Sequence, residues 1–289
     1  MKIVTDSAAD MPAEELAALG VTQAPLFIQF PDGEVSSPDI SADEFYDRLE
    51  AMHPAIPKTS QPSSGIFAQI YRQLAETDSQ ILSIHISSGL SGTLNSARGG
   101  AELAAPQAEV TLWDTMTLSG GERFQVMAAA LAARAGWTWL AIEKRLAEIR
   151  ANAEVIYTLE TVEYLARGGR IGRVQALAGM LLDIKPVIRV DHADGKYSTV
   201  AKVRSMSRGL AAIVDHLHGR YADTPLWLTV LHGRLADKAE ALAGQLSARL
   251  NVARLEVMRI SPVLGVHTGP GIVGAAVVPM QLMSGLDQG

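Results

Sequence analysis

The chain has 289 residues, of which 48% are hydrophobic and 19% are charged, and its formal net charge is −6. This length and composition predict one large or two ordinary domains with a substantial core, and the absence of a basic block among aromatic residues argues against nucleic acid as a partner. Cysteine is absent, which excludes disulfides, thiolate metal ligands and a cysteine nucleophile.

The first half of the chain alternates strand-like and helical segments. Strands are expected at 1–5, 81–86 and 110–113 and an extended apolar segment at 21–30, with helices at 13–19, 42–52, 64–75, 94–104, 118–135 and 138–153. This alternation is typical of a parallel sheet with helices on its faces. The start shows no signal-peptide pattern, and no apolar run reaches the roughly 18 residues of a membrane span. We therefore expect a cytoplasmic protein without stable membrane insertion.

After residue 150 the pattern changes to strands paired by hairpins, with helices between them. Strands are expected at 155–159, 185–190, 197–203, 227–231, 253–260 and 272–278, helices at 174–182, 208–218 and 237–250, and a loop at 261–271. The turn at 191–195 predicts a hairpin. The expected fold is thus α/β with two domains: a parallel sheet with flanking helices in residues 1–150 and a mixed sheet in residues 151–289.

A polar turn follows the strand at 81–86 and directly precedes a helix. Unsatisfied N–H groups and the positive end of the helix dipole make such a turn favourable for an anion. Ligands of parallel sheets lie at the carboxyl ends of the strands, where Asp6 and Asp114 are also expected. Because an anion site disfavours bare carboxylates, we expect these two aspartates to orient backbone and hydroxyl groups.

Ser91 in this turn has three interpretations. It can cap the helix, hold a bound anion, or act as a nucleophile. The run Gly89-Leu90-Ser91-Gly92-Thr93 approaches the G-x-S-x-G nucleophile elbow, but Thr93 stands where the last glycine belongs. A triad of Ser91, an aspartate and His267 would follow the chain order of the α/β-hydrolases.

Two further polar residues lie in proline- or glycine-rich surroundings. Thr59 lies between Pro57 and Pro62, which predicts a stiff extended loop, with an ordinary surface loop as the alternative. His267 precedes a Gly-Pro-Gly turn and is either structural or a donor, neutral or cationic, toward a carboxylate or phosphate. The histidines show no metal-ligand spacing, so no metal site is expected.

Arg167, Arg170 and Arg173 flank the glycines of a turn at 166–173. Guanidinium groups suit carboxylates and phosphates, so this turn is either a lid over a site, a docking surface for an acidic partner, or a solvated turn. Lys202 and Arg204 are candidates for the same docking role.

Six short motifs occur in order along the chain: Thr5-Asp6-Ser7, Thr59-Ser60-Gln61-Pro62-Ser63, residues 87–93, residues 164–171, Lys185-Pro186 and His267-Thr268-Gly269-Pro270-Gly271. Together they resemble the DegV family of fatty-acid-binding proteins over nearly the whole chain. The resemblance implies a long-chain fatty acid buried between or beneath the domains, with no other cofactor. It also implies a partner fatty acid kinase that phosphorylates the bound carboxylate.

The resemblance also assigns site residues. Thr59 and Ser91 would bind the carboxylate with His267 nearby, supported by Ser60, Ser87, Ser88, Gly89, Gly92, Thr93, Thr268 and Gly269. Candidates for the acyl tunnel, which plain core packing would explain equally well, are Phe27, Ile28, Phe30, Met180, Leu181, Leu182, Leu264 and Ile272.

We therefore expect a fatty-acid-binding protein with no catalytic step of its own. The first alternative is a serine hydrolase of acyl esters that uses Ser91 and His267. The second is a regulator that binds the phosphate of a small molecule at the turn at 87–93.

Overall fold

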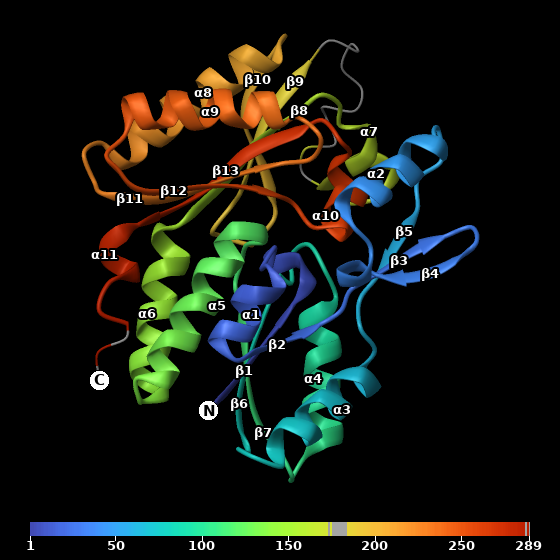
Figure 1. Ribbon diagram of the computed structural model, residues 1–289, viewed down its shortest axis with the longest axis vertical. Helices are drawn as coiled ribbons and strands as arrows, with labels where there is room; N and C mark the ends of the chain where they lie inside the picture. Colours follow the sequence, from blue (N-terminus) through green and yellow to red (C-terminus); the bar gives the residue numbers. More distant parts are fainter. Residues whose placement is uncertain (173, 175–183, 287, 289) are drawn as a thin grey trace.

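The computed structural model describes residues 1–172, 174, 184–286 and 288 (Figure 1). Arg173, the tunnel candidates Met180, Leu181 and Leu182, and all but the first residue of the helix predicted at 174–182 lie outside the described residues.

The N-terminal part contains the predicted parallel sheet. Its four strands lie in the order β2-β1-β6-β7, all parallel, with β1 at Lys2–Asp6, β2 at Val21–Ala24, β6 at Gln80–His85 and β7 at Glu109–Asp114. Helices α3 (Ser64–Ala75) and α4 (Thr93–Ala104) pack together and contact β6. Helix α3 buries Phe67, Ala68 and Tyr71 against this sheet, the spacing of one helical face.

Helix α5 (Ser119–Arg134) joins the two halves of the molecule. It contacts β1 and β6 on one side and β8 and β13 of the second sheet on the other (Figure 1). Nearly all of its side chains are buried, because both of its faces meet a sheet. Helices α1 (Ala13–Leu19) and α6 (Trp139–Asn152) lie beside it.

The second sheet has six strands in the order β10-β9-β8-β13-β11-β12. Neighbours are antiparallel except β11 and β12, so the predicted mixed sheet is confirmed. The strands are β8 (Glu154–Leu159), β9 (Lys185–Val190), β10 (Tyr197–Val203), β11 (Leu226–His232), β12 (Val252–Arg259) and β13 (Ile272–Pro279). Helices α8 (Met206–Tyr221) and α9 (Ala236–Arg249) cover the face away from α5.

Strand β13 is buried on both faces, and its side chains alternate between two cores. Val273, Ala275 and Val277 pack toward α8 and α9, whereas Ile272 and Ala276 face α5. Gly274, between these two, pairs with Tyr157 of β8, and a Cβ there would lie 2.4 Å from the Tyr157 Cβ. The small residues of β13 therefore leave space between the sheet and α5.

A third sheet was not expected. It has three antiparallel strands in the order β4-β3-β5, at Gly33–Ser36, Phe27–Phe30 and Lys58–Ser60. The segment predicted at 21–30 is extended, but it forms two strands of different sheets, because the chain breaks at Pro25, which cannot donate a ladder hydrogen bond. The predicted loop around Thr59 is strand β5, which pairs with β3.

The loop predicted at 261–271 is also wrong, because helix α10 occupies Pro262–Thr268. Ser261 before Pro262 is a common helix start, since proline lacks the N–H that the first turn leaves unpaired. Helix α10 packs against α2 (Ala42–Ala51), β3, β5 and α7 (Glu163–Arg167). The remaining short helices are at Ser7–Ala9, Ser37–Asp39 and Met280–Met283.

The predicted hairpin between β9 and β10 reaches the polar turn of the N-terminal half. Ser87 Oγ donates to the Gly195 carbonyl at 2.8 Å, and a Cβ on Gly89 would lie 2.5 Å from the Asp194 carbonyl oxygen. The two halves of the chain are thus in contact at the Ser87 turn.

Replacing Gly195 tests this contact. Gly195 and Gly136 both have left-handed φ angles, 64° and 80°, so alanine costs about 1–2 kcal/mol at either site. A Cβ at 195 would also lie 1.9 Å from Ser87 Oγ, whereas nothing lies within 4 Å at 136. Urea denaturation of Gly195→Ala should therefore show a loss of unfolding free energy larger than that of Gly136→Ala by about 1 kcal/mol or more. Equal losses would contradict a stabilising contact at Ser87.

Candidate functional site

Thr59, Ser91 and His267 line one cavity. They come from β5, the turn before α4 and the last turn of α10. The cavity lies beyond the carboxyl ends of β1 and β6, where ligands of parallel sheets are expected. The rest of its wall is mostly apolar: Ala8, Leu26, Ile86, Leu90, Arg170, Tyr197, Val263 and Leu264.

The Ser91 hydroxyl is held by the start of α4. The N–H groups of Leu90 and Ser91 both donate to the Ser87 carbonyl, at 3.0 and 3.1 Å, which forms the turn. Ser91 Oγ lies 2.8 Å from Thr93 Oγ1 and accepts from the Thr93 N–H at 3.3 Å. When the buried Thr93 hydroxyl is the donor of this pair, the Ser91 proton is free for a group in the cavity.

His267 is hydrogen-bonded to Thr59, with 2.8 Å between His267 Nε2 and Thr59 Oγ1. Burial lowers the pKa of His267 from 6.5 to about 3, and the nearby Arg170 charge lowers the pKa further in the same direction. The imidazole is therefore neutral at physiological pH, which favours the neutral donor over the cationic one.

These contacts do not assemble a hydrolase triad. His267 Nε2 pairs with Thr59, and Ser91 Oγ pairs with Thr93, so the serine and the histidine are not hydrogen-bonded to each other. His267 Nδ1 is buried and has no hydrogen-bond partner among the described residues, so none of their carboxylates orients the ring there. A nucleophilic serine needs both contacts.

The other residues expected to support the site lie in several places. Thr93 contacts Ser91 directly, and Ser87 holds the turn against the β9–β10 hairpin. Ser60 Oγ donates to Glu34 Oε2 at 3.3 Å on the opposite side of β5 from Thr59, because successive strand side chains alternate. The exposed Ser88 hydroxyl donates to Asp114.

The remaining supporting residues lie at the border of the site and make no polar contact with Thr59, Ser91 or His267. Thr268 Oγ1 donates to the Leu264 carbonyl at 3.1 Å within α10. Gly92 begins α4 beside the Gln61 side chain. Gly269 ends α10 and packs so tightly on Tyr164 that a Cβ would lie 2.3 Å from its ring.

Asp6 and Asp114 orient neighbouring groups, as predicted. The buried Asp6 carboxylate accepts from the N–H groups of Ala8 and Ile86, at 2.9 and 3.1 Å, and contacts His85 Nδ1 at 3.0 Å. Asp114 accepts from the N–H of Met116 at 3.0 Å and from Ser88. Asp6 thereby fixes the backbone where β1 and β6 enter the site.

The cationic residues divide into two groups. Arg170 lines the cavity and donates to the Gly168 carbonyl at 2.8 Å, a location that suits a lid or wall of the site more than a docking surface. Arg167 is exposed and pairs with Glu163 at 2.7 Å. Lys202 and Arg204 are exposed at the end of β10.

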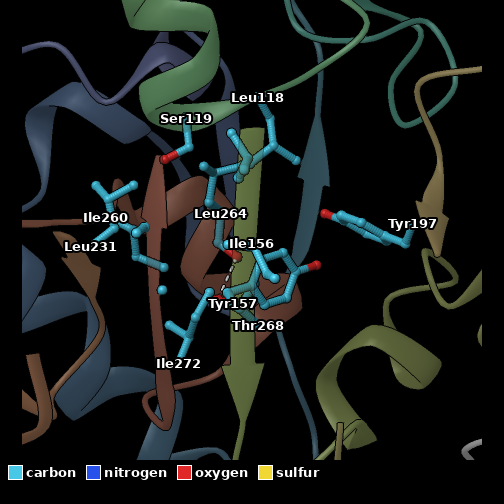
Figure 2. A pocket seen from close by; sticks show the side chains of 13 residues that line it. Leu118, Ser119, Ile156, Tyr157, Tyr197, Leu231, Ile260, Leu264, Thr268 and Ile272 are labelled. Atoms are coloured by element: carbon cyan, nitrogen blue, oxygen red, sulfur yellow. Dashed lines mark hydrogen bonds between the residues drawn. The ribbon is translucent and has the colours of Figure 1, made fainter. Parts of the chain in front are cut away.

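A second cavity, shown in Figure 2, adjoins the first. The two cavities share Tyr197 and Leu264. The second cavity lies between the mixed sheet and helices α5 and α10. Its wall is almost entirely apolar: Leu118, Ser119, Val155, Ile156, Tyr157, Leu231, Ile260, Thr268, Ile272, Gly274 and Ala275, besides the two shared residues. An apolar wall of this kind suits an apolar ligand.

Only part of this wall was anticipated. Leu264 and Ile272 line the cavity, but Phe27, Ile28 and Phe30 are not among the lining residues of either cavity. Phe30 instead packs on Phe45 of α2, with 6.5 Å between ring centroids. Tyr157, Tyr197 and Leu118 were missed, although the period-two alternation of β8 indicates that Tyr157 shares a face with Val155.

The described residues contain neither a membrane-spanning helix nor a metal-binding cluster. None of the helices within them is long and apolar enough to cross a membrane. No group of three or more histidine, cysteine, aspartate or glutamate residues in that part of the chain could hold a metal ion.

The neutral state of His267 makes stability depend on pH. Between about pH 3 and the unfolded pKa of 6.5, His267 is protonated in the unfolded chain but neutral in the folded protein. The free energy of unfolding therefore decreases as the pH falls through this range, by up to about 1.4 kcal/mol per pH unit, and this contribution is complete above it. The His267→Gln variant keeps an N–H toward Thr59 but does not titrate. It should lose less stability than the wild type between about pH 7 and about pH 4.5 in thermal melts.

The exposed His53 provides the control, and His53→Gln should keep the wild-type pH slope. Identical slopes for the wild type and His267→Gln would show that His267 is not held neutral by the fold.

Comparisons with known proteins agree with this architecture. A family model described as "Uncharacterised protein, DegV family" matches residues 1–280. A DegV domain-containing protein from Deinococcus radiodurans is 37% identical over 278 residues, covering 96% of this chain and 95% of that protein. A solved structure titled as fatty acid binding of a DegV family protein from Thermus thermophilus superposes with a TM-score of 0.89 at 30% identity, over 96% of this chain and 99% of that one.

A fatty acid (stearic acid)-binding protein from Eubacterium ventriosum gives a TM-score of 0.86 at 26% identity, over 96% of this chain and 98% of that one. The family match covers both sheets and the two cavities between them. The chain therefore belongs to the DegV family.

Proposed function

We propose that this protein binds a long-chain fatty acid, with its carboxylate at Ser91 and Thr59 and its acyl chain in the apolar cavity. One observation carries the proposal: the cavity in which Thr59, Ser91 and His267 gather adjoins an almost entirely apolar one, and Tyr197 and Leu264 line both. The fatty acid named for the Thermus thermophilus and Eubacterium ventriosum structures supports the same class of ligand.

The hydrogen bonds within the site leave hydroxyl protons available to a ligand. The neutral His267 can donate from Nε2 to Thr59 Oγ1, which leaves the Thr59 proton for the ligand. Thr93 can donate to Ser91 in the same way. Two hydroxyls then point their protons at one carboxylate, and the Arg170 guanidinium in the cavity wall adds a favourable charge.

The two cavities contribute differently to affinity. Burying about 14 methylenes at ~0.8 kcal/mol each gives an upper bound near ~11 kcal/mol. Each hydrogen bond to a charged group contributes roughly 1.5–3 kcal/mol. The tail therefore provides most of the affinity, while Ser91 and Thr59 prevent the cost of burying an unpaired carboxylate and fix the orientation of the lipid.

The proposed role is to present this carboxylate to a partner fatty acid kinase, which would convert it to an acyl phosphate. The exposed Arg167, Lys202 and Arg204 are the proposed docking residues, because exposed cations suit an acidic partner surface. Tyr197, which lines the cavities, begins the strand that carries Lys202, so the proposed docking surface and the site share β10.

The binding proposal is tested by mass spectrometry of the purified protein under denaturing conditions, followed by titration of the delipidated protein with stearate. A co-purifying fatty acid and a rise in melting temperature with added stearate are expected, because a ligand that binds only the folded state stabilises it. No lipid and an unchanged melting temperature would contradict the proposal.

Alanine at Ser91 or Thr59 should weaken stearate binding by about 10- to 150-fold, equivalent to one hydrogen bond to a charged group. Both variants should still retain lipid through the tail but lose phosphoryl transfer by a kinase more severely. Ser88→Ala is the matched control, because that hydroxyl pairs with Asp114 outside the cavity. Equal effects at Ser88 and Ser91, by isothermal titration, would remove Ser91 from the site.

A further inference from the structure

The apolar cavity contains one hydroxyl group that the fold does not use. Tyr157 is 3% exposed, and its hydroxyl is buried with no hydrogen-bond partner among the described residues. The phenol of Tyr197 stands nearby, with 5.8 Å between ring centroids and the rings nearly perpendicular. Burial raises the pKa of Tyr157, and the facing Tyr197 hydroxyl raises it further, by its charge and by a weak polar contact that does not have the geometry of a hydrogen bond. Figure 2 shows the Tyr157 hydroxyl pointing toward Tyr197.

Two other polar side chains of this cavity have partners. Thr268 Oγ1 donates to the Leu264 carbonyl at 3.1 Å, and the Ser119 hydroxyl donates to Asp10. A buried hydroxyl without a partner is destabilising, and phenylalanine at the same position would avoid that cost. The oxygen of Tyr157 is therefore the feature of this wall that simple packing does not explain.

The position of Tyr157 along the cavities is fixed by its neighbours. Gly274 lies directly across from it on β13, and its lack of a side chain leaves room for the ring. Tyr197 lines both cavities, so the two phenols lie near the region where the cavity lined by Ser91 meets the apolar cavity. An acyl chain whose carboxylate is at Ser91 would pass them partway along its length.

We propose that Tyr157 makes this cavity selective for fatty acids that carry a hydroxyl or keto oxygen within the acyl chain. The inference rests on the proposed fatty-acid function, since the carboxylate at Ser91 sets which carbons reach the phenol. An oxygen on the chain would accept from the Tyr157 hydroxyl, whereas a saturated chain leaves that hydroxyl unpaired. A carbon–carbon double bond offers only a weak π acceptor.

The experiment compares stearate, 10-hydroxystearate and 12-hydroxystearate on the delipidated full chain by isothermal titration. The wild type should bind at least one hydroxystearate about 2- to 10-fold more tightly than stearate, the range of one neutral hydrogen bond. In Tyr157→Phe this preference should disappear or reverse, while stearate binds at least as well as before. The variant should also melt no lower than the wild type without ligand, because it removes an unpaired hydroxyl.

Tyr221→Phe is the matched control, because its hydroxyl donates to the Asn152 carbonyl at 2.7 Å and is not part of either cavity. It should keep the wild-type preference. Stearate binding without any preference for a hydroxystearate, or a preference that survives in Tyr157→Phe, overturns the inference but leaves the proposed function intact. Failure of all three lipids to bind overturns both.

Discussion

The hydrogen bond between Thr59 Oγ1 and His267 Nε2 joins residues 208 positions apart, and the site is built around it. It joins the small sheet of β3, β4 and β5 to the last turn of α10, and both residues line the cavity that Ser91 also lines. Because burial keeps His267 neutral, one ring N–H serves the threonine, and the threonine proton remains available to a ligand. A cationic histidine there would remain a buried charge whenever the cavity held no anion.

The apolar half of the site depends on a different constraint, the packing of two sheets on one helix. Helix α5 contacts strands of both sheets, and the α5-facing side of β13 has glycine and alanine at 274 and 276. Larger residues would fill the space that now forms the apolar cavity, since protein interiors are otherwise packed without voids. The fold thus combines a group of hydrogen-bonded polar side chains in one cavity with an adjoining cavity that is apolar.

Much of this architecture follows from local sequence patterns. The alternation of strands and helices predicts the parallel sheet, and the turn at 191–195 predicts the hairpin, because both signals lie within one element or its neighbours. The third sheet was missed because β5 has only three residues and its pairing with β3 is not local. Helix α10 was not predicted because the glycine-rich sequence at its end is typical of a loop, and this pattern outweighed the helix-start signal at Ser261 and Pro262. The protonation of His267 and the unpaired hydroxyl of Tyr157 depend on residues distant in sequence, such as Arg170 and Gly274.

The central claim is that one carboxylate is held between the Ser91 and Thr59 hydroxyls, with an acyl chain extending past Tyr197 into the apolar cavity. An electron-density map of the purified protein, calculated without any ligand, tests this most directly. The account predicts a continuous tube of density that ends within hydrogen-bond distance of both hydroxyls and runs between the mixed sheet and α5. Density for a lipid head group elsewhere, or a compact anion at residues 87–93 with no density in the apolar cavity, would contradict it.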